Sequence, residues 1–188
     1  MAGDEKQAGE QKVQASELIR AGKYRDALAI CVREHGAALG RYCMAVLGEQ
    51  REAEEAVLQA LGVAYDAMPY WEADSKVRTW LFGLARRICI RRVEARRSVY
   101  PGPLAGEEDN ENAPSEELLK KRKRAQSVRQ ELNRLKPAER DVVILRYHSG
   151  LSWGDIATIC DASENDIRDQ ASRALLRLRE FIKEKRAE

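Results

Sequence analysis

The sequence predicts an all-α protein built as two small helical domains joined by a flexible acidic linker. Few stretches alternate apolar and polar residues with the period of a strand, whereas long stretches repeat apolar residues every three or four positions. Charged residues make up 34% of the 188 residues and aromatic residues only 6%, a balance that favours helices. A proline- and glycine-containing acidic stretch near the middle separates the helical parts. We therefore expect a polar N-terminal extension at 1–24, a first domain at 25–97, a linker at 98–115 and a second domain at 116–185.

The charge of the chain is small in total but uneven along the sequence. The net charge is +2, yet arginines gather at 86–97, Lys and Arg gather at 120–124, and an acidic stretch at 107–117 lies between them. A clustered basic surface with local acidic compensation is typical of proteins that bind a polyanion.

Several classes of protein are disfavoured by the residue inventory. The four cysteines stand far apart, and with two histidines they form no metal-ligand spacing, so we expect buried free thiols in a reducing cytoplasm and no cofactor. The N-terminus lacks an apolar signal core and no run reaches membrane-spanning length, which predicts a cytoplasmic protein with no membrane insertion. We expect no catalytic residues, because no nucleophile–base set or phosphate-cradling glycine loop is found.

The first domain begins with a long helical pattern that runs from Ala15 and is interrupted at Gly22 and Gly48. Its apolar face is expected to contain Leu28, Val32, Leu39, Cys43 and Val46. A second helix starts near Gln50 with acidic first turns, which the helix dipole favours, and ends before Pro69.

A third helix is predicted after a loop at 69–76, and its residues divide into apolar stripes and a basic arc. The two apolar stripes contain Val77, Leu81, Leu84 and Ile88, and Phe82, Ala85, Cys89 and Val93. The remaining arc contains Trp80, Gly83, Arg86, Arg87, Arg91 and Arg97. Guanidinium groups on this arc can pair with phosphates and stack on bases, whereas Arg92 and Arg96 point nearer the apolar side and are expected to be structural. The alternative is that the arc is only a solvated face.

The second domain is predicted to start at Ser115 and Glu116 and to continue as a helix up to Pro137, which begins another. The apolar residues of the first of these helices are Leu118, Ala125, Val128, Leu132 and Leu135. Two Ser-x-x-Asp starts follow, at Ser152 and Ser163, and each resembles a helix-capping box. Asp161, between them, is suited to a left-handed turn.

This pattern of a short helix, a tight turn and a longer helix predicts a helix-turn-helix motif. The longer helix should bury Ile167, Ala171, Ala174, Leu175 and Leu178. Its other face should expose Glu164, Asn165, Arg168, Asp169, Ser172 and Arg173 to a DNA major groove. The alternative is an ordinary helical hairpin with a solvated face.

Three stretches resemble bacterial RNA polymerase sigma factors of the extracytoplasmic-function (ECF) group. The domain that binds the upstream (−35) promoter element is similar to LKPAERDVVILRYHSGLSWGDIATICDASENDIRDQASRALLRLRE. The segment that meets the melted downstream (−10) element is similar to RTWLFGLARRICIRR, and the helix that docks on the polymerase clamp is similar to VLGEQREAEEAVLQALGVAYDAM. The resemblance implies that 25–97 binds the clamp and the downstream element, and that 116–185 binds the upstream element. It also implies core RNA polymerase, promoter DNA and an anti-sigma factor as partners.

The resemblance implies particular contact residues in the first domain. The downstream-element contacts would be Trp71, Trp80, Arg86, Arg87 and Arg91, and the clamp contacts Glu52, Glu55, Gln59 and Leu61. Trp71 lies in the loop that captures a flipped base in the family, and both stacking on such a base and packing in the core are open for it.

Two departures from the family pattern are visible. Leu58 and Leu61 stand where the docking helix usually has a carboxylate and an aromatic residue, which predicts weaker charge pairing with the clamp. Asp169 would repel phosphate unless it accepts a hydrogen bond from a cytosine amino group. Two other functions therefore stay open: a stand-alone helix-turn-helix regulator, and a sigma-like adaptor that does not open promoters.

Overall fold

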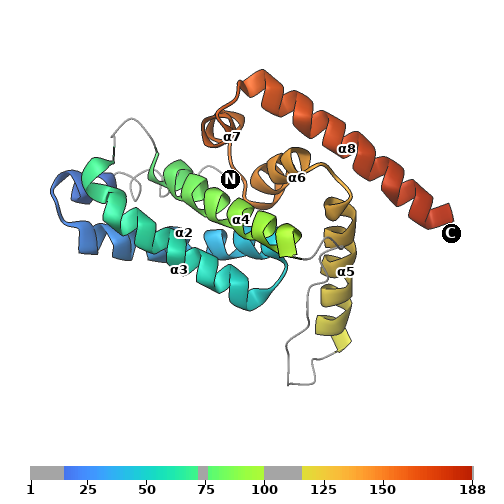
Figure 1. Ribbon diagram of the computed structural model, residues 1–188, viewed down its shortest axis with the longest axis horizontal. Helices are drawn as coiled ribbons and strands as arrows, with labels where there is room; N and C mark the ends of the chain where they lie inside the picture. Colours follow the sequence, from blue (N-terminus) through green and yellow to red (C-terminus); the bar gives the residue numbers. More distant parts are fainter. Residues whose placement is uncertain (1–14, 72–75, 100–115, 188) are drawn as a thin grey trace. The chain divides into compact units, whose positions relative to one another are not determined.

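The computed structural model describes residues 15–71, 76–99 and 116–187, which form helices and turns without a strand among them (Figure 1). The chain divides into two compact units, Met1–Gly102 (unit 1) and Pro103–Glu188 (unit 2), and each is described by itself. The prediction of an all-α chain with two small helical domains is confirmed. Residues 100–115, which hold most of the expected linker, lie outside the described residues.

Unit 1 is built on three long helices that lie side by side. It contains α2 (Tyr24–Leu47), α3 (Gln50–Ala67), the short 3₁₀ helix η1 (Met68–Tyr70) and α4 (Val77–Val99). Gly22 and Gly48 interrupt the chain as expected: their φ angles of 71° and 86° lie in the left-handed region, where a Cβ would introduce strain.

Helical structure in unit 1 begins at residue 15, as the helical pattern from Ala15 predicted, and so before the expected domain boundary at residue 25. Residues 15–20 are helical, and Ala15 and Ile19, which stand four positions apart on one helix face, are 1% and 4% exposed. The expected polar extension at 1–24 is therefore wrong for residues 15–20, because this segment is helical and buries two of its side chains. At the other end, α4 continues to Val99, two residues past the expected limit.

The apolar face of α2 agrees with the expected face in the second half of the helix and is shifted by one residue in the first half, where Ala27 and Cys31 are buried in place of Leu28 and Val32. Leu39, Cys43 and Val46 are buried as expected, but Val32 is 46% exposed and its neighbour Cys31 is buried. The buried residues of α2 are Ala27, Cys31, His35, Leu39, Tyr42, Cys43, Val46 and Leu47. The helix therefore buries a histidine and a tyrosine, which apolar spacing alone does not predict.

Both predicted stripes of α4 are buried, and they form the centre of unit 1. All eight residues, Val77, Leu81, Phe82, Leu84, Ala85, Ile88, Cys89 and Val93, are at most 6% exposed. The ring of Phe82 meets the ring of Tyr42 edge-on, with 5.6 Å between centroids, which is a favourable aromatic geometry. A hydrogen bond from Cys89 lowers the pKa of the neighbouring Cys43 thiol.

Unit 2 contains α5 (Glu116–Asn133), α6 (Pro137–Val143), the π-helix η2 (Ile144–His148), α7 (Trp153–Cys160) and α8 (Glu164–Ala187). One part of its core joins Leu135, Val143 and Ala174, against which Leu132, Leu178 and Phe181 pack. Val128 was expected to be apolar core but is 59% exposed. The side chains of Leu118 and Ala125 lie outside the described residues.

Buried charges link α6 to α8 within unit 2. Glu139 is 5% exposed, and its carboxylate accepts a 2.6 Å hydrogen bond from Arg177. Arg140 is 6% exposed and donates to the side-chain oxygen of Asn133 at 2.8 Å. Because a buried charge is costly without a partner, these pairs hold α6 in one position relative to α5 and α8.

The helix-turn-helix prediction is confirmed in its local details. Ser152 caps α7 by accepting from the backbone N–H of Asp155 at 3.1 Å, and the Asp155 side chain completes the capping box. The Ser163 hydroxyl oxygen accepts from the backbone N–H of Asp166 at 3.1 Å, at the start of α8. Asp161, between the helices, has φ 52° and ψ 53°, so it is in the left-handed conformation.

Candidate functional site

The polar face of α8 is exposed over its first three turns. Ile167, Ala171 and Ala174 are buried, whereas all six expected contact residues, Glu164, Asn165, Arg168, Asp169, Ser172 and Arg173, are exposed. Leu175 and Leu178 are half-buried rather than fully buried. The helix therefore presents one continuous row of donors and acceptors of the kind that reads base edges.

Arg168, in the middle of this row, has a defined environment. Its guanidinium donates to Glu164 at 2.5 Å and lies 5.3 Å from the centroid of the Trp153 ring. Trp153, the first residue of α7, also has the guanidinium of Arg146 at 4.6 Å from its ring. Neither Trp153 nor Arg146 was among the expected contact residues. The signal that could have found Trp153 was a large aromatic residue at a position directly after a helix cap.

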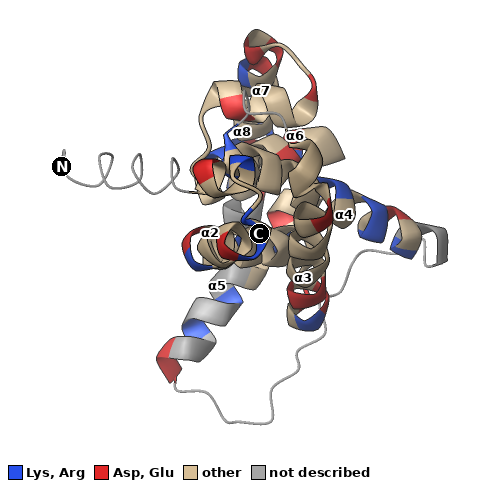
Figure 2. Cartoon of the chain, turned by 90° about the vertical axis from the view of Figure 1, so that its left-hand side faces the viewer, with Lys and Arg blue, Asp and Glu red and all other residues tan. Residues whose placement is uncertain are grey.

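The basic arc of α4 is divided in two by the structure. Arg87 and Arg91 are exposed one turn apart, while Trp80 and Arg86 are half-buried. Figure 2 shows the blue bands of basic residues along α4 and the red bands of acidic residues along α3. The side chain of Arg97 lies outside the described residues.

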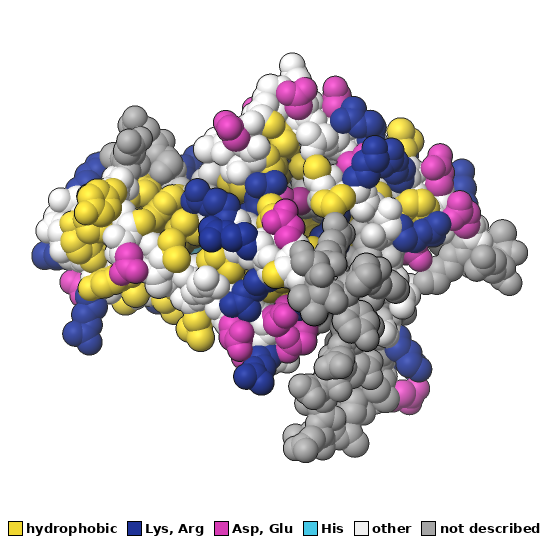
Figure 3. Space-filling model, in the orientation of Figure 1, with side chains coloured by type: hydrophobic (Ala, Val, Ile, Leu, Met, Phe, Trp, Pro, Cys, Tyr) yellow, Lys and Arg dark blue, Asp and Glu magenta, His cyan; other side chains and the backbone are white. Residues whose placement is uncertain are grey.

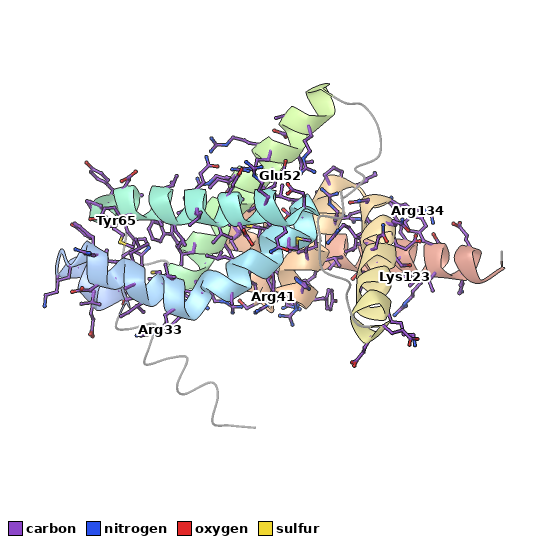
Figure 4. The ribbon with its side chains drawn as sticks, turned by 90° about the horizontal axis from the view of Figure 1, so that it is seen from below. Arg33, Arg41, Glu52, Tyr65, Lys123 and Arg134 are labelled. Carbon is purple, nitrogen blue, oxygen red and sulfur yellow. The ribbon has the colours of Figure 1, made fainter. Side chains whose placement is uncertain are left out.

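Arg92 and Arg96 are structural, as expected from their position near the apolar side of the helix. Arg96 donates to the Glu52 carboxylate at 2.9 Å and to the backbone carbonyl of Leu47, at the end of α2, at 3.1 Å. Arg92 donates to Glu55 at 3.3 Å and to Gln59 at 3.1 Å. In Figure 4, Glu52 is labelled where α3 passes α4.

Three of the four residues expected to contact the clamp already form hydrogen bonds with other side chains of unit 1. Glu52, Glu55 and Gln59 are all partners of α4 arginines. The hydrogen bonds from Arg92 and then from Arg51 lower the pKa of the Glu55 carboxyl. The fourth expected contact, Leu61, is wrong: it is 8% exposed, because it packs on the buried side of α3.

Hydrophobic side chains also gather on the surface of unit 1, over the part at the left of Figure 3. The large exposed apolar residues of α3 and η1 are Leu58, Val63, Tyr65 and Tyr70. Leu58 is 70% exposed, and it stands between the paired side chains of Glu55 and Gln59 in the sequence of the expected docking helix.

The environment of Trp71 agrees fully with neither stacking on a flipped base nor packing in the core. Its ring is half-buried and lies 6.3 Å from the ring of Trp80, tilted by 51°. Within the described part of the chain, its indole nitrogen is buried and finds no hydrogen-bond acceptor. Residues 72–75 of the same loop lie outside the described residues.

Two further features of the described residues concern metal binding and membrane insertion. Within residues 15–71, 76–99 and 116–187, no group of three or more His, Cys, Asp or Glu residues could hold a metal ion. In the same described residues, none of the helices combines the length and the apolar character that crossing a membrane requires.

Comparison with known proteins identifies both units. Residues 31–99 match the family Sigma-70 region 2, and residues 125–178 match Sigma-70 region 4. The chain is 24% identical over 169 residues to the RNA polymerase sigma factor YlaC of Bacillus subtilis, covering 88% of this chain and 98% of YlaC. It is 28% identical over 156 residues to the ECF RNA polymerase sigma factor SigL of Mycobacterium tuberculosis, covering 80% and 86%.

Two solved structures share the fold over most of the chain. The structure of CnrH in complex with the cytosolic domain of CnrY has a TM-score of 0.73 at 18% identity, covering 92% of this chain and 97% of that one. The sigma factor RpoE of Bartonella quintana, solved with the anti-sigma factor NepR, has a TM-score of 0.64 at 25% identity, covering 86% and 97%. Both sigma regions are present in order, and the curated relatives are matched over most of their length. The chain therefore belongs to the ECF group of RNA polymerase sigma factors, which are non-enzymatic factors that direct core RNA polymerase to promoters and initiate transcription.

Proposed function

We propose that this sigma factor uses three separate surfaces: the polar face of α8 for the upstream promoter element, the basic face of α4 for the melted downstream element, and α3 for the polymerase clamp. The observation that carries the proposal is that α4 buries both of its apolar stripes, that α8 buries Ile167, Ala171 and Ala174, and that each helix exposes a charged or polar face. The exposed arginines of α4 suit a polyanionic partner, and the mixed donors and acceptors on the exposed face of α8 suit base edges.

The upstream element is assigned to Glu164, Asn165, Arg168, Asp169, Ser172 and Arg173. All six are exposed on successive turns of one helix that is long enough to lie in a major groove. Asp166 is excluded from this set because its carboxylate and backbone N–H both bond to Ser163 at the start of the helix. Asp169 is assigned to a cytosine amino group, since a carboxylate accepts but does not donate.

The downstream element is assigned to Arg87 and Arg91, with Trp80, Arg86 and Trp71 beside them. The two exposed arginines supply phosphate contacts, and the Trp71–Trp80 pair supplies apolar rings against which an unstacked base can pack.

The clamp is assigned to the outer side of α3, through Glu52, Glu55 and Gln59. The Glu55 side chain keeps 49% of its surface exposed while it is paired with Arg92, so a basic clamp residue can reach it. Leu58 adds an exposed apolar contact. The internal pairs with α4 make the clamp contact weaker than in a relative whose carboxylates are free of such partners, since the clamp must compete with them.

The remaining parts of the proposal concern activity and context. The chain acts without catalytic residues of its own, works in the cytoplasm where the polymerase is, and is controlled by an anti-sigma factor. The last point rests on the solved relative RpoE, whose structure contains its anti-sigma factor.

The test is a pull-down with purified core RNA polymerase followed by run-off transcription on a library of genomic fragments from the source organism. We expect co-purification and transcripts with defined start sites. Core binding without transcripts would instead favour a sigma-like adaptor, which the missing clamp carboxylate and Asp169 would explain. Sequence-specific duplex binding without core binding would favour a stand-alone regulator.

A further inference from the structure

The ring of Trp153 joins three helices of unit 2 at the start of the helix-turn-helix motif. From η2, the Arg146 guanidinium lies 4.6 Å from the ring, and the Tyr147 ring meets it edge-on with 6.5 Å between centroids. From α8, the Arg168 guanidinium lies 5.3 Å from the same ring. The packing of guanidinium groups on an indole is favourable, because the ring face carries negative charge density.

The position of Trp153 is itself fixed by its neighbours along the chain. Arg146 donates a 2.8 Å hydrogen bond to the carbonyl of Leu151, a residue that is fully buried. Ser152 then caps α7 through its capping box, so the first residue of the helix has a set direction. The indole is therefore a rigid surface on which the Arg168 side chain lies.

Arg168 is held a second time, by Glu164 one turn earlier on α8. The pair bonds at 2.5 Å, with both side chains about half exposed. The Glu164 carboxylate also lies against the first turn of α7, since a Cβ at Gly154 would be 3.6 Å from its Oε2 atom. A flexible arginine is thus held in one conformation from two sides before any partner binds.

The charge of this arrangement indicates what Arg168 recognises. A carboxylate beside the guanidinium repels phosphate, so the pair is poorly suited to bind the DNA backbone. The guanidinium uses one of its N–H groups for Glu164 and keeps the others in a planar fork, which matches the two acceptors of a guanine in the major groove. Holding the fork in advance lowers the entropy cost of that contact.

We propose that Trp153 is a positioning residue for Arg168, and that Glu164 acts through Arg168 rather than directly on DNA, so that the three side chains together select a guanine in the upstream element. This inference rests on the proposed function of α8. It adds a residue outside the recognition helix to the determinants of promoter choice, and it changes the role of Glu164 from a DNA contact to a support.

The test uses the full chain bound to core RNA polymerase. A duplex library with a randomised upstream region is first selected with the wild-type holoenzyme. Dissociation constants are then measured for the selected duplex and for duplexes in which each G·C pair is replaced by A·T. We expect one position where wild type discriminates by roughly tenfold, as a bidentate arginine contact does.

At that position, Trp153→Leu and Arg168→Ala should both lose the discrimination, and the double variant should lose no more than either single one. Trp153→Phe should retain it, because a phenyl ring also offers a face to the guanidinium. Glu164→Gln should lower the discrimination while it raises affinity for unrelated duplexes, since a charge that repels phosphate is removed. Arg179→Ala, an exposed arginine farther along α8, is the matched control and should leave the discrimination unchanged.

Several results would overturn the inference. Trp153→Leu keeps an apolar side chain at the site, and its unfolding temperature is measured beside its binding. A folded Trp153→Leu variant that still discriminates like wild type would show that the ring does not position Arg168. Loss of discrimination in Arg179→Ala to the same degree would show a general charge effect. If the wild-type holoenzyme selects no upstream sequence at all, the proposed function of α8 fails first, and the inference fails with it.

Discussion

Arginines on α4 have two different environments, and exchanging them for alanine should separate the binding of a melted strand from the stability of unit 1. Arg87 and Arg91 are exposed. Arg96 has only 25% of its side-chain surface exposed, pairs with Glu52 and donates to the carbonyl of Leu47. We compare the double variant Arg87→Ala/Arg91→Ala with the single variant Arg96→Ala, which serves as its control because it removes a cation from the same helix.

The double variant should change the salt dependence of single-strand binding, whereas Arg96→Ala should change the free energy of unfolding. Each phosphate contact to a single strand contributes about 0.7 to the slope of log affinity against log salt, so losing two flattens the slope by about 1.4. Over a fourfold rise in salt, this is roughly a sevenfold smaller loss of affinity than in wild type. Arg96→Ala instead leaves the partly buried Glu52 carboxylate without its partner, which costs about 1.5–3 kcal/mol of unfolding free energy. At about 4–8 °C per kcal/mol for a domain of this size, unit 1 should melt at least about 6 °C lower.

Two assays measure these effects on the same preparations. Fluorescence anisotropy of a labelled single strand against the holoenzyme gives the salt slope, and permanganate footprinting gives promoter opening. Circular dichroism gives the unfolding temperature of the free chain. We expect the double variant to show a flatter slope and fewer open complexes at unchanged stability, and Arg96→Ala to show the reverse. A double variant that opens promoters like wild type with the wild-type salt slope would refute the reasoning, because the exposed arc would then be only a solvated face.

Three further changes follow from the burial and the pKa values in unit 1. Leu84→Ala removes a side chain that is 6% exposed, so it should cost about 2–5 kcal/mol of unfolding free energy, measured by denaturant titration, with no change in salt slope. Burial, and then the charge of Glu34, raises the pKa of the Cys31 thiol from 9.0 to about 11. The contribution of this neutral thiol to the free energy of unfolding is fully present below pH 9 and is lost as the pH rises towards 11. At pH 8 the half-buried Cys160 should therefore react with a thiol reagent well before Cys31. Equal labelling rates of the two cysteines would contradict the buried position of Cys31. Because Arg92 and Arg51 lower the pKa of Glu55 below its ordinary 4.5, the stability it adds is present above that pH and is lost as the pH falls through the lowered value. Glu55→Gln should therefore make the acid limb of the unfolding curve shallower, and an unchanged limb would show that the pairing adds nothing to stability.

Features that depend on neighbours in the chain were predicted correctly from the sequence alone. Both stripes of α4, the breaks at Gly22 and Gly48, and the left-handed Asp161 follow from helical periodicity and from the φ angles that particular residues tolerate. The capping of α7 by Ser152 is equally local, since its partner is three residues away. The exposed row on α8 follows from the same period, because the buried face of an amphipathic helix determines the opposite face.

Only the tertiary structure decided which side chains are engaged across helices. Helical periodicity shows the direction in which a side chain points but not what lies opposite, so it could not show that Glu52 meets Arg96, 44 residues later in the chain. Packing also exposes Val32, which periodicity placed in the core, and buries Leu61, which the family resemblance placed on the docking surface. The contact of Arg168 with the Trp153 ring also joins two helices through a turn whose geometry sets the distance between them. The sequence determines which residues lie on each face of a helix. The residues that those faces contact are determined only when the helices pack, because the distance between side chains on different helices is not a property of either helix alone.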